Sequence, residues 1–169
     1  VVTLANANND FTQVNVNATS TNIVDINSIQ LGNSNITGSG NSLTVTANGT
    51  GNITQAGSSI ITNNAVGAVT TLTATDNAIT LKGNNNFREV TASAASLGIT
   101  DTGALDIGNV TLTGTNATTL DIDAGGLVQQ VATTRIINNG TGAITDINNV
   151  GNVVTLANAN NDFTQVNVN

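Results

Sequence analysis

The sequence contains no cysteine, methionine, proline, histidine, tryptophan or tyrosine. Without cysteine the chain can form neither a disulfide framework nor a thiolate metal site. Without histidine it lacks the commonest general base and the commonest transition-metal ligand. Because methionine is missing, we expect the native N-terminus to lie upstream of Val1 or to have been removed by processing.

Charge is also scarce. Charged residues make up 8% of the chain, and ten acidic residues against three basic ones give a net charge of −7. Nucleic-acid binding needs a basic surface, so this balance excludes nucleic acid as a partner and argues against anionic lipid. No apolar run approaches the ~18 residues that cross a bilayer, so we expect no membrane-spanning segment.

A perfect repeat is the clearest feature that is present. Residues 1–17 and residues 153–169 both read VVTLANANNDFTQVNVN, at an offset of 152. We therefore expect residues 1–152 to form one repeat and residues 153–169 to begin the next identical one, within a longer tandem array. Arrays of identical units typically provide length, spacing or many copies of one surface.

The 152-residue unit is itself a duplication. Its aromatic residues are Phe11, Phe87 and Phe163, and Phe87 lies midway between the other two in the sequence. Many of the residues between them also match at this offset, which is half that of the perfect repeat. The sequence therefore predicts two diverged 76-residue halves, 11–86 and 87–162, which we call half-repeats.

Short stretches alternate apolar and polar residues, as in Leu43-Thr-Val45-Thr-Ala47. This period of two predicts strands with one buried face, and helical spacing is absent. Gly and Asn separate the strands and tolerate the left-handed backbone of tight corners. The lack of proline agrees with strands that use every backbone hydrogen bond.

The apolar residues recur in three columns. The first column contains Phe11, Ile36, Ile61, Phe87, Leu112, Ile136 and Phe163. The second contains Ile29, Ile53, Ile79, Leu105, Val128 and Val154. A looser third column contains Ile23, Leu43, Val69, Ile99, Leu120 and Ile144.

Three recurring strands describe one turn of a solenoid. The sequence thus predicts an all-β fold, a right-handed parallel β-solenoid (β-helix) with three faces and a core lined by these columns. The steps within the columns predict about 25 residues per turn, three turns per half-repeat and six turns per 152-residue repeat.

Several motifs resemble a known family. They are the segments Asn9–Val16, Ile29–Gly32, Leu43–Ala47 and Gly51–Gln55, and the approach to Phe87. Over essentially the whole chain they resemble the repeats of filamentous-haemagglutinin-like exoproteins and related large bacterial adhesins. The resemblance implies a right-handed parallel β-helix, export to the cell surface and a stalk, fibre or adhesin role. The near-perfect 152-residue repetition raises a filament-forming surface fibre or biofilm matrix protein as an equal interpretation.

Candidate chemistry is sparse. Asp121 and Asp123 share the outer face of one strand and are candidates for calcium binding or glycoside chemistry. Acidic residues do not recur once per turn, so a solvated surface is the favoured interpretation. We expect no catalytic residues, no cofactor and no metal site, and we do not expect an enzyme.

Two further motifs concern the surface. Thr-x-Thr, which can order water and bind ice when stacked on successive turns, occurs at Thr44/Thr46, Thr71/Thr73/Thr75 and Thr111/Thr113/Thr115. Because the motif moves between columns, an ordinary β-branched surface is favoured. Glycosylation sequons occur at Asn17, Asn35, Asn48, Asn52, Asn109, Asn116 and Asn139.

These observations favour a structural protein, an extracellular fibre or stalk built from tandem β-solenoid repeats. Its expected partners are copies of itself, arranged end to end along a filament as covalent repeats or as stacked subunits. One alternative is an adhesin shaft that binds glycan or a host surface laterally, and another is an ice-binding solenoid. The expected location is extracellular or on the cell surface, in a bacterium.

Overall fold

The computed structural model describes residues 1–114 and 117–169, and within them it contains strands and no helix. The strands are β1 (Val2–Leu4), β2 (Gln13–Ala18), β3 (Thr21–Asp25), β4 (Ile29–Ile36), β5 (Ser42–Ala47), β6 (Ile53–Gln55), β7 (Ile61–Asn63), β8 (Val69–Phe87), β9 (Glu89–Asp101), β10 (Leu105–Leu112), β11 (Thr119–Ala124), β12 (Val128–Gln130), β13 (Ile136–Asn138), β14 (Ile144–Asn148), β15 (Val154–Thr155), β16 (Asp162–Phe163) and β17 (Val166–Val168).

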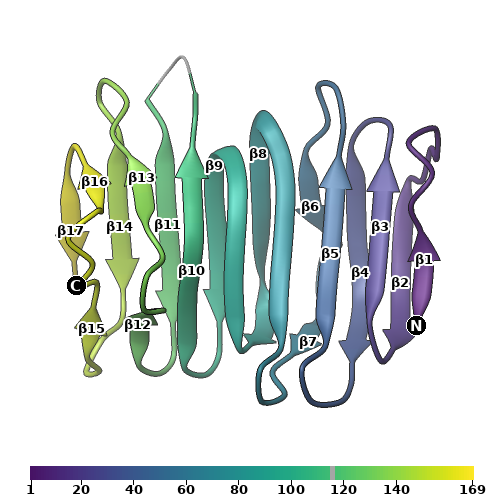
Figure 1. Cartoon of the computed structure of the whole chain (residues 1–169), viewed down its shortest axis with the longest axis horizontal. Helices are drawn as coiled ribbons and strands as arrows, with labels where there is room; N and C mark the ends of the chain where they lie inside the picture. Colours follow the sequence, from purple (N-terminus) through teal and green to yellow (C-terminus); the bar gives the residue numbers. More distant parts are fainter. Residues whose placement is uncertain (115–116) are drawn as a thin grey trace.

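The strands stack in parallel as a β-solenoid, which confirms the predicted fold class. Two columns of strands wind around one core, and their arrows run in opposite directions in Figure 1, upward for β3, β5 and β10 and downward for β4 and β14. Column A contains β1, β3, β5, the first parts of β8 and β9, β10, β12 with β13, and β15 with β16. Column B contains β2, β4, β6 with β7, the later parts of β8 and β9, β11, β14 and β17.

The longer turns have one straight side and one bent side. In the bent strand β4, the first residues pair with β6 and the last residues pair with β7. The bend falls at Gly32, where a Cβ atom would lie 2.2 Å from Oδ1 of Asn15. A larger residue at position 32 would displace the side chains of Asn15 and Gln13 on the neighbouring turn.

β15 is the equivalent of β1 at the 152-residue offset. Seven strand pairings in column A lead from β1 to β15, and each pairing corresponds to one turn. The repeat therefore contains seven turns, one more than the six expected. The step between paired residues is not constant at 25. It is 27 from Leu43 to Thr70 but only 17 from Gln13 to Gln30. The short turns arise because two residues, Thr19 and Ser20, separate β2 from β3.

A half-repeat therefore spans three and a half turns. β3 and β5 lie in column A, whereas their counterparts in the second half-repeat, the end of β9 and β11, lie in column B. The contacts themselves are preserved: Gln13 pairs with Gln30, and Glu89 pairs with Asp106 at the equivalent positions one half-repeat later. The two half-repeats thus make equivalent contacts on opposite sides of the solenoid.

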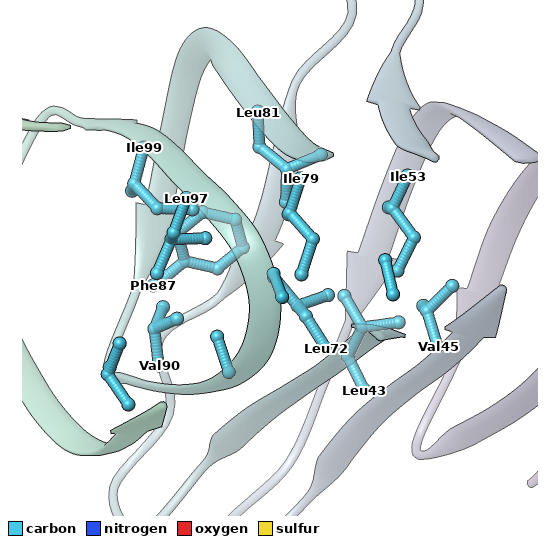
Figure 2. Close-up of a cluster of buried hydrophobic side chains, with 14 of the residues drawn as sticks. Leu43, Val45, Ile53, Leu72, Ile79, Leu81, Phe87, Val90, Leu97 and Ile99 are labelled. Atoms are coloured by element: carbon cyan, nitrogen blue, oxygen red, sulfur yellow. The ribbon is translucent and has the colours of Figure 1, made fainter. Parts of the chain in front are cut away.

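The core is a continuous row of aliphatic side chains with Phe87 among them (Figure 2). Nine of the eleven predicted core residues are at most 3% exposed, namely Ile29, Ile36, Ile53, Ile61, Ile79, Phe87, Leu105, Leu112 and Ile136. The other two, Phe11 and Phe163, are partly buried and pack against that core. All three phenylalanines therefore contribute to the interior.

The expected first column is not one stacked row. Phe87 lies beside Asn63, and Ile61 lies beside Ser34. In the second column Ile29, Ile53 and Ile79 are in register, but Ile79 then pairs with Leu97 instead of Leu105. Leu105, Val128 and Val154 pair with one another in column A, whereas Ile29, Ile53 and Ile79 lie in column B. The expected second column is therefore split between the two sides of the solenoid, and the split occurs at β9.

The third column is wrong at two positions. Val69 is half-buried and Ile144 is 38% exposed, while the adjacent Thr70 and Thr145 are fully buried. The side chains of Asn63 and Asn138 donate hydrogen bonds to these two threonine hydroxyls, both at 3.0 Å. A buried hydroxyl that is hydrogen-bonded can take the place of an aliphatic side chain in the core. The threonines therefore point inward, and the neighbouring Val69 and Ile144 point outward.

The right-handed coil stays a prediction.

Candidate functional site

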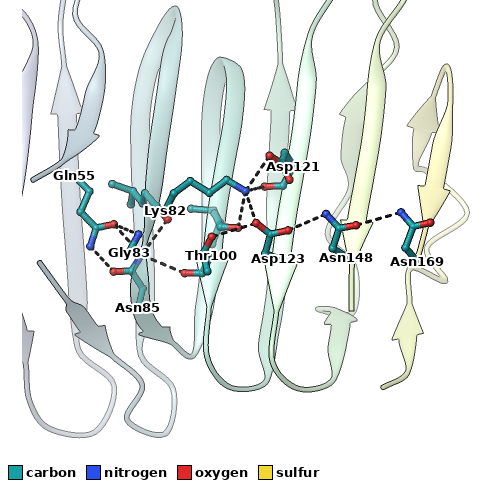
Figure 3. A network of polar contacts seen from close by, with 11 residues as sticks. Gln55, Lys82, Gly83, Asn85, Thr100, Asp121, Asp123, Asn148 and Asn169 are labelled. Atoms are coloured by element: carbon teal, nitrogen blue, oxygen red, sulfur yellow. Dashed lines mark hydrogen bonds and ion pairs between the residues drawn. The ribbon is translucent and has the colours of Figure 1, made fainter. Parts of the chain in front are cut away.

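The most elaborate polar cluster joins β6 to β8 (Figure 3). Nε2 of Gln55 donates to Oδ1 of Asn85 at 2.7 Å, and Nδ2 of Asn85 donates to Oε1 of Gln55 at 3.0 Å. Asn85 is fully buried. We call this reciprocal pair and its backbone partners the amide lock.

Backbone groups of three successive turns complete the amide lock. The N–H of Ile61, in the turn below, donates to Oδ1 of Asn85 at 3.0 Å. In its own turn, Nδ2 of Asn85 donates to the carbonyl of Leu81 at 3.0 Å. In the turn above, the same nitrogen donates to the carbonyl of Thr100 at 3.2 Å. The lock therefore fixes the register of three turns without any charge.

A second cluster holds the backbone at Phe11 and at Phe87. The N–H of Phe87 donates to Oδ2 of Asp101 at 2.6 Å, and Phe11 donates to Asp25 with the same geometry. The other oxygen of each carboxylate accepts the N–H two residues further on, at Gly103 and Asn27. Both carboxylates are buried, and we call this arrangement the carboxylate clamp.

The carboxylate clamp differs from an ion pair because backbone N–H groups, and not a basic side chain, contact the carboxylate. Burial raises the pKa of Asp101, and the hydrogen bonds from Phe87 and Gly103 partly oppose this rise. Asp25 and Asp101 occupy equivalent positions of the two half-repeats, but no sequence motif indicated that they were buried. Their presence at one position of both half-repeats was the available signal.

A third cluster runs along the outside of column B (Figure 3). Nζ of Lys82 lies 2.9 Å from a carboxylate oxygen of Asp121 and 2.9 Å from one of Asp123. Nδ2 of Asn148 donates to Asp123 at 2.8 Å, and Nδ2 of Asn169 donates to Asn148 at 3.2 Å. This outer ladder links the turns of β8, β11, β14 and β17.

The outer ladder assigns a role to the candidate calcium residues. Asp121 and Asp123 contact the ammonium group of Lys82, so a cation of the chain itself lies between them. The hydrogen bond from Lys82 is the main reason that the pKa of Asp123 is lowered. Among the described residues, no three His, Cys, Asp or Glu side chains are grouped as metal ligands would be.

Hydroxyl groups form a small array on the outside of column A. Thr44 pairs with Thr71, which pairs with Thr91. Thr46 pairs with Thr73, and Thr73 pairs with Ser93. These six half-exposed residues, which we call the hydroxyl array, correct the expectation that Thr-x-Thr does not stack on successive turns. Thr115 lies outside the described residues.

The sequons occupy the surface. Asn17, Asn35, Asn109 and Asn139 are exposed, and Asn48 and Asn52 are half-exposed. Asn116 lies outside the described residues. Corner asparagines bridge the turns, because Oδ1 of Asn33 accepts the N–H of Ile60 at 3.0 Å and Oδ1 of Asn109 accepts that of Arg135 at 3.1 Å.

Comparison with known proteins adds no relative. Within the described residues, no helix is long and apolar enough to cross a membrane. No protein-family model, curated protein or solved structure matches the chain. The fold is that of a parallel β-solenoid repeat protein, and its polar clusters are contacts that join one turn to the next.

Proposed function

We propose that this chain is a repeating segment of an extracellular fibre or stalk of the bacterial cell surface, and that its partners are copies of itself. The observation that carries this proposal is the recurrence of the same inter-turn contacts one half-repeat later, on the opposite side of the solenoid. Because each half-repeat supplies contacts equivalent to those of the one before it, copies can be added without new surface chemistry.

The polar clusters support a passive mechanical role. The amide lock and the carboxylate clamp form their hydrogen bonds with groups of the same chain, both within one turn and between neighbouring turns. Such groups hold register along the axis, which a fibre needs in order to stay straight under load. The resemblance to adhesin repeats gives the same role at the cell surface.

Tandem chains of one, two and four copies test the proposal. Small-angle scattering and electron microscopy should show rods of constant width that lengthen by roughly 34 Å per copy, since seven turns rise ~4.8 Å each. A chain of the same composition with its residue order scrambled controls for nonspecific extension. Compact particles, or a length that does not grow with copy number, would overturn the proposal.

The hydroxyl array favours a second candidate, an ice-binding surface. Its hydroxyls are separated by ~4.8 Å between turns and by roughly 6.7 Å along a strand, which gives a flat, regular lattice that orders water. Inhibition of ice recrystallisation by the tandem chains is the test. Thr71→Lys should abolish that inhibition, whereas Asp146→Lys on column B should not, and equal activity of both variants would exclude the array.

An adhesin shaft remains the alternative for the lateral surface. Glycan arrays with the tandem chains separate it from a passive fibre, because a shaft should bind specific glycans in proportion to copy number. Because the three phenylalanines pack against the core, such binding would rely on other side chains that are exposed on the surface.

A further inference from the structure

We propose that Gln130 and Asn161 close, at the junction between two successive copies, the same amide lock that Gln55 and Asn85 close inside the chain. This inference rests on the proposed function and names the contact by which one copy continues into the next. The partner is a second copy joined in phase with the perfect repeat.

Asn161 already holds the lower part of a lock. Nε2 of Gln130 donates to its Oδ1 at 2.7 Å, and its Nδ2 donates to Oε1 of Gln130 at 2.8 Å. The N–H of Ile136 donates to Oδ1 at 2.9 Å, and Nδ2 donates to the carbonyl of Leu156 at 3.3 Å. These are the counterparts of the bonds that Gln55, Ile61 and Leu81 make to Asn85.

Asn9, the residue equivalent to Asn161 one repeat earlier, holds the upper part. Its Nδ2 donates to the carbonyl of Leu4 at 2.9 Å and to the carbonyl of Val24 at 3.1 Å. Val24 is the counterpart of Thr100, whose carbonyl completes the interior lock. The bonds of Asn161 and Asn9 together reproduce the whole set that surrounds Asn85.

Only one arrangement of two copies joins these parts. When residues 153–169 of one copy serve as residues 1–17 of the next, the carbonyl equivalent to Val24 lies directly above Asn161. A separate copy stacked on the end would instead place a second 1–17 segment there, so two identical turns would follow one another. The lock therefore distinguishes a shared, covalent junction from stacked subunits.

The test compares Asn161→Ala in the single chain and in a two-copy tandem chain, with Asn85→Ala as the interior control. Hydrogen exchange at the Ile136 amide is the measurement. In the tandem chain the substitution should lower protection of this amide by roughly tenfold more than in the single chain, to the level that Asn85→Ala produces at Ile61.

Three outcomes are distinguishable. An equal effect of Asn161→Ala in the single and tandem chains overturns the lock. If the variant fails to fold, hydrogen exchange at the Ile136 amide is compared between the unsubstituted single and tandem chains. Stronger protection in the tandem chain supports the lock, and equal protection overturns it. Scattering from the unsubstituted tandem chain tests the fibre separately, because a rod of doubled length with equal protection contradicts the lock alone.

Discussion

Asp101 and Phe87 are fourteen residues apart, yet the carboxylate of Asp101 accepts the backbone N–H of Phe87 at 2.6 Å in the interior of the solenoid. Asp25 and Phe11 repeat the contact at the same distance. Among the described residues, no basic side chain forms an ion pair with the buried carboxylate of Asp101. Two backbone N–H groups solvate it instead.

Removing the clamp should destabilise the fold strongly. Asp101→Ala leaves the N–H groups of Phe87 and Gly103 without their acceptor, at about 1–3 kcal/mol for each buried group. We expect a loss of about 2–4 kcal/mol in the free energy of unfolding, measured by urea denaturation. Asp146→Ala, a half-exposed position, is the matched control and should lie within about 0.5 kcal/mol of the parent. Similar losses for the two variants would contradict a structural role for the clamp.

The clamp also predicts a pH dependence. The folded-state pKa of Asp101 is raised above its ordinary value of 3.8, so between 3.8 and the raised value the folded state binds more protons than the unfolded state. The contribution of Asp101 to stability is therefore fully present below pH 3.8 and falls as pH rises through the folded pKa. Urea midpoints of the parent minus those of Asp101→Asn should decline across this window. A difference that rises with pH would contradict the assignment.

The outer ladder predicts the opposite slope. The pKa of Asp123 is lowered, chiefly by the hydrogen bond from Lys82, so its contribution is present above pH 3.8 and is lost as pH falls through the folded pKa. Because the pair is partly exposed, Asp123→Asn should cost less than about 1 kcal/mol at neutral pH and should be nearly silent in strong acid. Thermal unfolding at low and high salt checks this, since added salt should shrink the neutral-pH difference.

The phase of β8 gives a fourth prediction. Thr70→Val replaces the hydroxyl that faces Asn63 and leaves the buried amide unpaired, so we expect a loss of about 1–3 kcal/mol. Thr71→Val, one residue along on the outer face, should change stability by less than about 0.5 kcal/mol. Chemical denaturation of both variants decides the matter, and the opposite ranking would show that the strand faces the other way.

The sequence was sufficient for the parallel solenoid because apolar residues such as Ile29, Ile53 and Ile79 recur at nearly equal steps and stack in register. It failed at Thr70 and Thr145, because a buried hydroxyl bonded to an asparagine cannot be told from an exposed one by polarity alone. It also missed the amide lock, since the partners Gln55 and Asn85 are 30 residues apart and belong to abundant polar types.

The predicted number of turns per repeat was wrong for a different reason. An average step of 25 hides the two-residue connection between β2 and β3 and the uninterrupted path of β9. These short turns add half a turn to each half-repeat. Counting turns from a sequence thus requires the lengths of individual connections as well as the period of the apolar residues.

That half turn has a mechanical consequence. Any unevenness between the bent and straight sides tends to curve the rod, but one half-repeat later the bent side lies on the opposite face, and the curvature reverses. Successive deflections therefore cancel, so a long array keeps a straight mean axis although every half-repeat is asymmetric. Viewed from opposite sides, such an array presents the same order of bent and straight sides displaced by half a period.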